Sequence, residues 1–353
     1  MSIIWADNFD NYGTTESRLL DGLYADYDSI SIETDPDPNE TGRCIKVGDA
    51  TQGFLRHVFS ATGLTTAGMS MRVWLTEIPE SESDLANIFQ LRDSSNVVNV
   101  SIVVSPTGTF RAYRGSSDGT LLGESTAAMT AQAWHHVEVK VTVDSSAGAV
   151  EVRYNGVTVL SLTGQNTQAG AANLSQVYFA SKTGGITGTF QTSFYMKDYI
   201  VWDTTGSQNN DFLGTCHVYT LRPDGDSSLN WDVSTGTTGY NLIDDTSPDD
   251  ADYISADDTP PGASVFTLED LPPDIVSVKA LIPVTRMAKI DGGDGNVQMG
   301  LTSNGSTDLG ADNPITTAFT YWWDVSELSP DTGVSWTPSE VDDALFQIDR
   351  TTP

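Results

Sequence analysis

The side chains with the clearest chemical potential in this sequence are four aspartates that flank its first 205 residues. Asp7 and Asp10 lie in the opening segment, and Asp198 and Asp203 lie in a late apolar segment. The first and last strands of a β-sandwich often lie side by side, which would bring these carboxylates together. Calcium takes about six to eight oxygen ligands from carboxylates and carbonyls. We therefore predict Asp7, Asp10, Asp198 and Asp203 as candidate ligands of a structural calcium ion, and we expect no other cofactor.

A second acidic stretch lies between residues 244 and 258 and holds seven aspartates. It lacks the regular Asp-x-Asp-x-Asp-Gly spacing of a preformed calcium loop. Two interpretations stay open, which are a calcium site and a solvated turn.

The four histidines, His57, His135, His136 and His217, do not form a metal or catalytic motif. His135 and His136 are adjacent, and neighbouring side chains of a strand point to opposite faces, so the pair cannot face one metal ion. No Ser-His-Asp order, zincin motif, P-loop or dinucleotide fingerprint occurs. The sequence therefore offers no candidate catalytic residues.

Charge and apolar patterning exclude several classes of function. The chain has 17 basic and 48 acidic residues, a net charge of −31, which repels nucleic acid phosphates. No apolar run is long enough to span a bilayer, and the first residues do not resemble a signal peptide. Cys44 and Cys216 fit no zinc spacing or disulfide framework, so both are expected to be free thiols. We expect no nucleic acid partner and no membrane insertion.

Strand signals dominate the chain. Residues 137–143 alternate valine with polar side chains, and residues 150–154 repeat this period of two. Asn155-Gly156 then favours a tight type I′ turn, because both residues tolerate positive φ, and Val157 begins the next strand. Similar alternation at residues 276–282, 297–301 and 319–325 predicts strands in the second half. These patterns predict an all-β fold.

Length and linker composition predict two antiparallel β-sandwich, or jelly-roll, domains in tandem. A chain of 353 residues is too long for one typical sandwich. Residues 206–212 lie in a polar segment, so we assign 1–205 to the first domain, 206–212 to a linker and 213–353 to an acidic second sandwich. Residues 338–344 could form one helical turn before a last strand at 345–348.

The first domain resembles the concanavalin A-like lectin and glucanase superfamily, in particular its laminin-G-like jelly rolls. The resemblance rests on WADNFDNY at 5–12, on the segment from WHHVEVKV through the Asn155-Gly156 hairpin at 134–164, and on FYMKDYIVWD at 194–203. Glucanases of this superfamily use paired carboxylates on one strand face. The corresponding Glu-x-Asp-x-x-Glu pattern is missing, and the acidic run at 77–84 is broken by Pro79. We therefore predict that the protein is not an enzyme.

The second domain resembles C-terminal modules of tailed-bacteriophage structural proteins, through LGTCHVYTLRPDGD at 213–226 and SWTPSEVDDALFQI at 335–348. This resemblance implies a surface-exposed virion protein, such as a tail fibre, a spike or a capsid decoration protein. Other capsid or tail proteins would be its partners, host-surface glycans a further contact, and a homotrimer the favoured oligomer. Two alternatives stay open: a carbohydrate-binding module of a secreted system, and a glycoside hydrolase with an unrecognised site.

Overall fold

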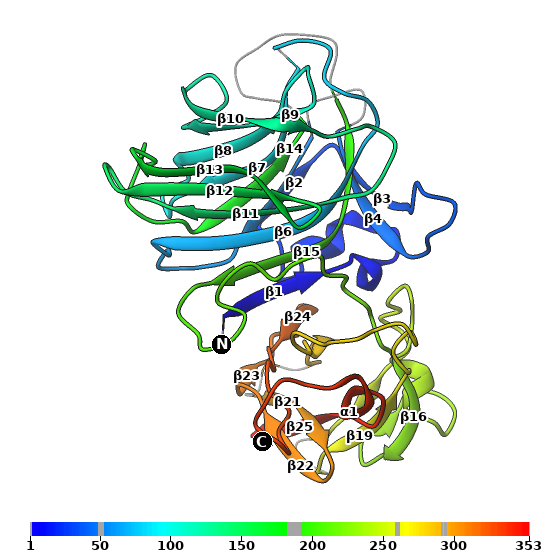
Figure 1. Cartoon of the computed structure of the whole chain (residues 1–353). Helices are drawn as coiled ribbons and strands as arrows, with labels where there is room; N and C mark the ends of the chain where they lie inside the picture. Colours follow the sequence, from blue (N-terminus) through cyan, green and yellow to red (C-terminus); the bar gives the residue numbers. More distant parts are fainter. Residues whose placement is uncertain are drawn as a thin grey trace. The chain divides into compact units, whose positions relative to one another are not determined.

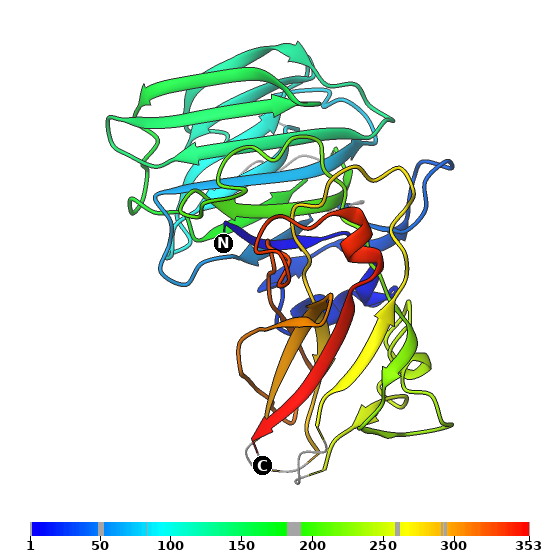
Figure 2. The same cartoon turned by 60° about the horizontal axis from the view of Figure 1, so that its bottom comes forward.

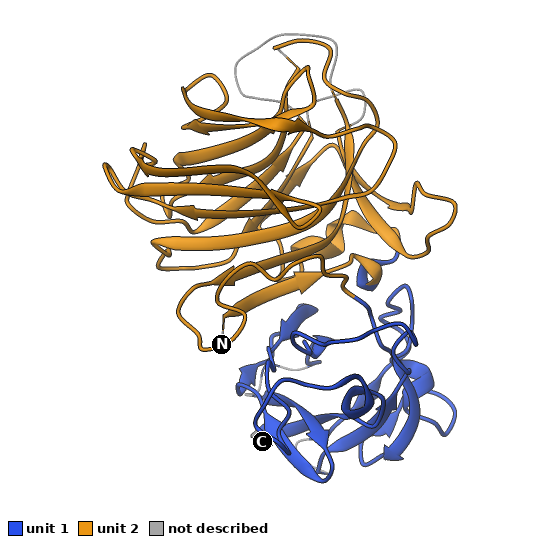
Figure 3. Cartoon of the chain, viewed as in Figure 1, with its two compact units in different colours: residues 1, 11–13, 219–353 blue, residues 2–10, 14–218 orange. Residues whose placement is uncertain are grey.

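The computed structural model describes residues 2–48, 53–82, 84–181, 192–257, 262–290, 292 and 295–352 (Figure 1). Nearly all regular structure is antiparallel β-sheet, which confirms the predicted all-β class. The chain divides into two compact units (Figure 3). We call residues 2–10 and 14–218 the N-terminal unit, and residues 1, 11–13 and 219–353 the C-terminal unit.

The N-terminal unit contains an eight-stranded sheet, here called sheet A. Its strand order is β13-β12-β11-β6-β15-β4-β3, and β1 pairs with β15. The strands are β1 (Ile3–Asp7), β3 (Ile30–Thr34), β4 (Arg43–Val47), β6 (Thr66–Leu75), β11 (His135–Thr142), β12 (Gly148–Tyr154), β13 (Val157–Gln165) and β15 (Phe194–Asp203). The first and last strands of this unit therefore lie side by side, as expected.

A seven-stranded sheet, sheet B, forms the second layer of this unit. Its order is β10-β9-β8-β7-β14-β5-β2. The strands are β2 (Asp26–Asp28), β5 (Phe54–Val58), β7 (Ala86–Arg92), β8 (Val98–Val104), β9 (Thr109–Arg114), β10 (Thr120–Ala128) and β14 (Gln176–Ala180). Two short 3-10 helices, η1 (Asp10–Tyr12) and η2 (Glu16–Leu20), follow β1.

The two sheets enclose the hydrophobic core of the N-terminal unit. Alternate residues of each strand face inward: Met69, Met71 and Val73 of β6 are fully buried. The Phe179 ring of sheet B meets the Tyr199 ring of sheet A edge to face, with centroids 4.9 Å apart. The intervening residues of each strand form the outer faces of the sandwich, so each outer face is defined by the period of two.

The predicted hairpin turn between β12 and β13 is confirmed. Asn155 and Gly156 have φ of 49° and 79°, and Tyr154 pairs with Val157. Positive φ at both central residues is the type I′ geometry that matches strand twist. In the part of the chain that the structure describes, neither Cys44 nor Cys216 forms a disulfide.

The predicted linker belongs to the N-terminal unit, whose boundary lies after Val218. Residues 211–218, which we call the strap, lie against the outer face of sheet A. The main-chain N–H groups of Leu213 and Gly214 donate to Glu138 Oε1 on β11, at 2.9 and 3.0 Å. The polar composition of residues 206–212 predicted a domain boundary there, whereas the residues just after them, Leu213 and Gly214, are hydrogen-bonded to sheet A. Whether the two units fold as independent domains stays a prediction.

The C-terminal unit is built on one six-stranded antiparallel sheet, in which β25 lies between β19 and β21 (Figure 2). Two short two-stranded ribbons, β17–β18 and β20–β24, complete its strands. The sheet comprises β16 (Pro223–Ser228), β19 (Ser264–Leu268), β25 (Leu345–Thr352), β21 (Asn296–Ser303), β22 (Ser306–Leu309) and β23 (Asn313–Pro314). The ribbons comprise β17 (Asp232–Val233), β18 (Ile254–Ser255), β20 (Val284–Met287) and β24 (Thr320–Trp323), and η3 is Tyr240–Leu242.

One face of this sheet is apolar and carries the core of the unit. Phe266, Met299 and Ile348 belong to the main buried cluster. The predicted helical turn is present as α1 (Pro338–Asp342), which has a capping box at Thr337, and β25 follows it. The strand predicted at residues 276–282 does not form, and Val276 is 91% exposed. An alternating pattern suffices for an extended chain, but a strand also needs a paired neighbour.

No helix in the described part of the chain is long and apolar enough to cross a membrane.

Candidate functional site

The outer face of sheet A carries polar and charged side chains whose positive charges are matched by carboxylates. Arg72 on β6 donates to Glu40 at 2.7 Å, and Lys197 on β15 contacts Asp35 and Glu40. On the same face, Lys140 pairs with Asp211 at 2.5 Å and Arg153 with Glu151 at 3.0 Å. Hydrogen bonds from Arg72 and Lys197 lower the pKa of Glu40 to about 2. This face is electrostatically self-contained.

The strap seals part of this face. The Arg153 guanidinium carbon lies over the Phe212 ring, 3.7 Å from the ring centroid. Beneath the strap, Ser70 Oγ, Glu138 Oε2 and both ring nitrogens of His136 are buried without a hydrogen-bond partner. Burial raises the pKa of Glu138 and lowers the pKa of His136 to about 4. A ligand would have to displace the strap to reach these groups.

The predicted calcium ligands near the N-terminus are occupied by protein donors. Asp7 is 3% exposed and accepts hydrogen bonds from the Tyr24 hydroxyl at 2.9 Å and the Phe9 main-chain N–H at 2.7 Å. Asp10 accepts from the Arg43 main-chain N–H at 2.6 Å. Neither carboxylate is aimed at a common centre with the other predicted ligands.

The other two predicted ligands lie elsewhere along β15. Asp198 accepts from the Val218 main-chain N–H at 3.2 Å and contacts His217 Nδ1 at 3.1 Å on the outer face. Asp203, at the end of the strand, accepts from Thr205. Within the described residues, no group of three His, Cys, Asp or Glu side chains could hold a metal ion. The geometry gives the calcium site at Asp7, Asp10, Asp198 and Asp203 no support, and it stays a prediction.

The acidic stretch at 244–258 also shows no convergence in its described part. Asp250 pairs with Arg286, and Asp252 accepts from the Ser234 hydroxyl at 3.2 Å. Mutual repulsion adds to burial in raising the pKa of Asp245. Asp258 lies outside the described residues.

The outer face of sheet B presents a different arrangement, centred on Tyr178 of β14. The Arg92 guanidinium on β7 stacks 3.6 Å from the Tyr178 ring centroid, and the Arg56 guanidinium on β5 lies 5.9 Å from it. Phe54 packs beside the same ring, with centroids 5.3 Å apart. Strands β5, β14 and β7 are neighbours, and Tyr178 pairs with both Arg56 and Gln90. We call Phe54, Arg56, Gln90, Arg92, Gln176 and Tyr178 the arginine–tyrosine site.

Both arginines of this site are held by neutral side chains. Arg92 Nε donates to Gln90 Oε1, and Arg56 Nε donates to Gln176 Oε1, each at 3.0 Å. Among the described residues, neither arginine forms an ion pair with a carboxylate. Burial, together with the nearby charge of Arg56, lowers the pKa of Arg92. The result is a partly buried pair of uncompensated cations in a chain of net charge −31.

The nearest carboxylate in the sequence is bound elsewhere. Asp93 follows Arg92 directly, is 1% exposed, and accepts main-chain N–H groups of Val97 at 2.8 Å and Ala171 at 2.7 Å. Its charge is therefore committed to holding two loops. Asp26 of β2 lies opposite Arg56 in the strand register. Because neither arginine forms an ion pair among the described residues, the site can bind an anion.

Sequence reasoning missed this site. One signal was available, since Gln90 and Arg92, and likewise Gln176 and Tyr178, alternate with apolar residues and therefore share a strand face. Basic residues are rare in this chain, so an arginine on such a face is informative. The sequence gives no indication, however, that β14 lies between β5 and β7.

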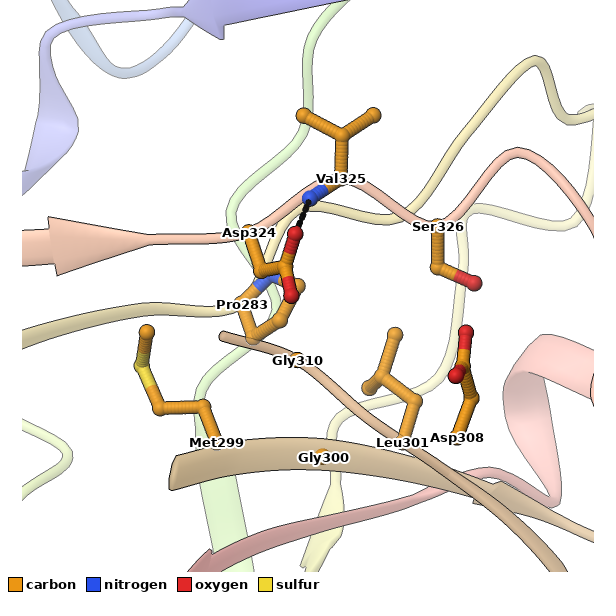
Figure 4. Close-up of a pocket in the computed structure, with 9 residues that line it drawn as sticks. All are labelled: Pro283, Met299, Gly300, Leu301, Asp308, Gly310, Asp324, Val325 and Ser326. Carbon is orange, nitrogen blue, oxygen red and sulfur yellow. Dashed lines mark hydrogen bonds between the residues drawn. The ribbon is translucent and has the colours of Figure 1, made fainter. Parts of the chain in front are cut away.

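A small hollow lies in the C-terminal unit (Figure 4). Its lining combines apolar groups with Asp308 and Asp324, and Asp324 accepts from the Val325 main-chain N–H at 2.8 Å. Its volume of about 10 Å³ is roughly that of one water molecule. A sugar ring or cofactor cannot enter it, so the arginine–tyrosine site is the stronger candidate.

No protein-family model matches the sequence, and no curated protein matches it. The fold is similar to solved carbohydrate-active enzymes. An endo-β-1,4-glucuronan lyase from the fungus Trichoderma reesei has 14% identity and a TM-score of 0.37, and the match covers 54% of this chain and 93% of that one. Alginate lyase vAL-1 from Chlorella virus has 11% identity and a TM-score of 0.40. The match covers 57% of this chain and 99% of the lyase. A sialidase has 14% identity and a TM-score of 0.35, covering 49% of this chain but 16% of the sialidase.

These similarities contradict the prediction of a non-enzymatic virion protein. The named structures are polysaccharide lyases and a sialidase. They give the tailed-phage resemblance no support. The missing glucanase carboxylates misled the sequence argument, because they exclude one hydrolytic mechanism and not every way of cleaving a glycan. Trimer formation and virion location stay untested predictions.

Proposed function

We propose that the N-terminal unit binds an acidic polysaccharide on the outer face of sheet B and cleaves it by β-elimination, as a polysaccharide lyase. The observation that carries the proposal is the pair of guanidinium groups, Arg56 and Arg92, that flank Tyr178 without a carboxylate partner. Similar structures include lyases of glucuronan and alginate, which are polymers of uronic acids. A polyuronate is therefore the proposed substrate class.

The residues of the site match the chemical demands of this reaction. Elimination removes the proton next to the uronate carboxylate and expels the glycosidic oxygen, leaving a double bond in the new sugar end. A guanidinium on the carboxylate would stabilise the negative charge that develops as the proton leaves. Tyr178 is the proposed group for acid–base chemistry: its phenolate would take the proton from carbon, and the resulting phenol would give that proton to the departing glycosidic oxygen. No water or metal has to enter the balanced reaction.

The experiment is turnover of a panel of polyuronates by pure protein, followed by the ultraviolet absorbance of the unsaturated product. Tyr178→Phe should lower kcat by about 100-fold or more, because it removes the group proposed to transfer the proton. Tyr154→Phe is the matched control on sheet A, where the Tyr154 hydroxyl contacts His135 Nδ1 at 3.0 Å. Equal activity of wild type and Tyr178→Phe would refute the assigned site.

A second candidate function is binding of an acidic glycan without cleavage. The contact between the Phe54 and Tyr178 rings favours it, because neighbouring aromatic rings offer a stacking surface to sugars. If the protein binds alginate saturably but forms no unsaturated product, while a known lyase is active in the same assay, binding without cleavage is the function.

A further inference from the structure

Two arginines in the N-terminal unit are held in the same way by side chains that differ in charge. On β12, Arg153 Nε contacts Glu151 Oε1 at 3.0 Å. On β7, Arg92 Nε contacts Gln90 Oε1, also at 3.0 Å. In both cases the holder lies two residues before the arginine on the same strand face. The two pairs therefore differ mainly in whether the acceptor carries a negative charge.

We infer that Gln90 is a specificity-determining residue, which positions Arg92 without cancelling its charge and so reserves that charge for an anionic group of the glycan. This inference rests on the proposed binding face. Gln90 is 5% exposed and pairs with Tyr178 across β7 and β14, so it lies at the centre of the site. Its amide oxygen directs the Nε edge of Arg92 toward the protein.

The remaining contacts of Arg92 are also neutral. One terminal nitrogen donates to Asn96 Oδ1 at 3.1 Å, and the ring of Tyr178 covers one face of the guanidinium. Gln176 gives Arg56 the same neutral acceptor, and its own amide N–H donates to the Asp93 main-chain oxygen at 3.2 Å. The surroundings thus orient both cations and leave their charges uncompensated.

A carboxylate at position 90 would change the site without changing its shape. Glutamate has the size of glutamine and would keep the hydrogen bond to Arg92, but it would form an internal ion pair like that of Glu151 and Arg153. An anionic ligand would then compete for Arg92 with the carboxylate introduced at position 90, and that carboxylate would also repel the ligand. The ligand recognised by the native site is accordingly a glycan with carboxylate or sulfate groups, and a neutral glycan gains nothing from the glutamines.

The test compares wild-type protein with Gln90→Glu and with Glu151→Gln, the reverse exchange on sheet A. Binding is measured by calorimetry on the full chain with alginate, dextran sulfate and neutral dextran. Gln90→Glu should weaken alginate binding about tenfold or more at low salt. That difference should shrink as salt screens the charges, which a purely structural defect would not do. Glu151→Gln should bind like the wild type.

The outcomes separate the two claims. If the wild type binds alginate and Gln90→Glu binds equally well at low salt, the inference fails while the proposed function stands. If the wild type binds none of the polymers, both fail. Dextran sulfate binding equal to alginate binding would assign the site to anionic glycans in general, and weaker binding would assign it to carboxylates. Gln90→Met removes the acceptor but adds no charge, and it should lose less affinity than Gln90→Glu; a larger loss would overturn the role of charge.

Discussion

The outer face of sheet A and the arginine–tyrosine site of sheet B are built from the same kind of strand, yet their arginines have different partners. Elsewhere on sheet B, Arg111 pairs with Glu82 and Glu124. On sheet A, Arg72 and Arg153 have carboxylate partners, and the strap covers part of the surface. On sheet B, Arg56 and Arg92 have glutamine partners. An arginine on a strand face is thus not by itself a binding residue. The charge of its acceptor decides whether it serves the fold or a ligand.

This comparison also separates stability from function. The ion pairs on sheet A can contribute to the free energy of folding. Because their cations are already neutralised by carboxylates, they do not attract an anionic substrate. The uncompensated pair on sheet B costs some stability, since two like charges share one partly buried surface, and an anion would remove that cost.

The largest effect is expected when the same charge is removed from each face. Arg92→Gln should weaken alginate binding roughly 30-fold or more, equivalent to about 2 kcal/mol, because it removes one of two cations that contact the anion. Arg153→Gln, its match on sheet A, should leave binding unchanged. Calorimetric titration measures the alginate affinity of both variants. If the two variants lose affinity equally, alginate binding is not specific to the arginine–tyrosine site.

A smaller effect, on stability alone, is expected at the strap. Glu138→Ala would leave the main-chain N–H groups of Leu213 and Gly214 without their acceptor. The free energy of unfolding should fall by about 2–3 kcal/mol. Glu151→Ala, at a more exposed pair, should cost under about 1 kcal/mol. Urea denaturation monitored by tryptophan fluorescence gives both values, and equal costs would mean that the strap is not held through Glu138.

The smallest effect concerns acid pH. The folded pKa of Glu40 is lowered to about 2 from an ordinary value of 4.5, so its stabilising contribution is complete above that value and is lost as pH falls toward 2. Since Glu40 is partly exposed, we expect less than about 1 kcal/mol. Wild type should be more stable than Glu40→Gln above pH 5, with the gap closing in acid. A gap that widened on acidification would contradict the ion pairs assigned to sheet A.

Local strand structure was predictable to a large extent. The valine alternation at residues 137–143 and the Asn155-Gly156 turn correspond to β11 and the β12–β13 hairpin. The helical turn predicted at residues 338–344 and the last strand correspond to α1 and β25. Residues 276–282 show the limit, because they carry the same alternation but have no paired strand. Alternation indicates that a segment can adopt an extended conformation, but it does not indicate which strand the segment pairs with.

The candidate site could not be predicted from local sequence patterns, because it depends on the order of strands in sheet B. Arg56, Arg92 and Tyr178 lie far apart in the chain, and only the order β5-β14-β7 makes them neighbours. The structure does not bring the predicted calcium ligands together, for a related reason. Pairing of β1 with β15 was foreseen, but Asp7 faces the core while Asp198 faces the opposite side of the sheet.

By itself the sequence determined an all-β chain with turns at defined positions and a strongly acidic surface. These properties follow from side-chain period, turn chemistry and charge, all of which are local or additive. Only the tertiary structure decided which charges are neutralised. Whether Arg92 meets glutamine or a carboxylate depends on strand order, on side-chain direction and on Asp93 being held by loop amides. Those are contacts between distant segments, and no local pattern in the chain encodes them.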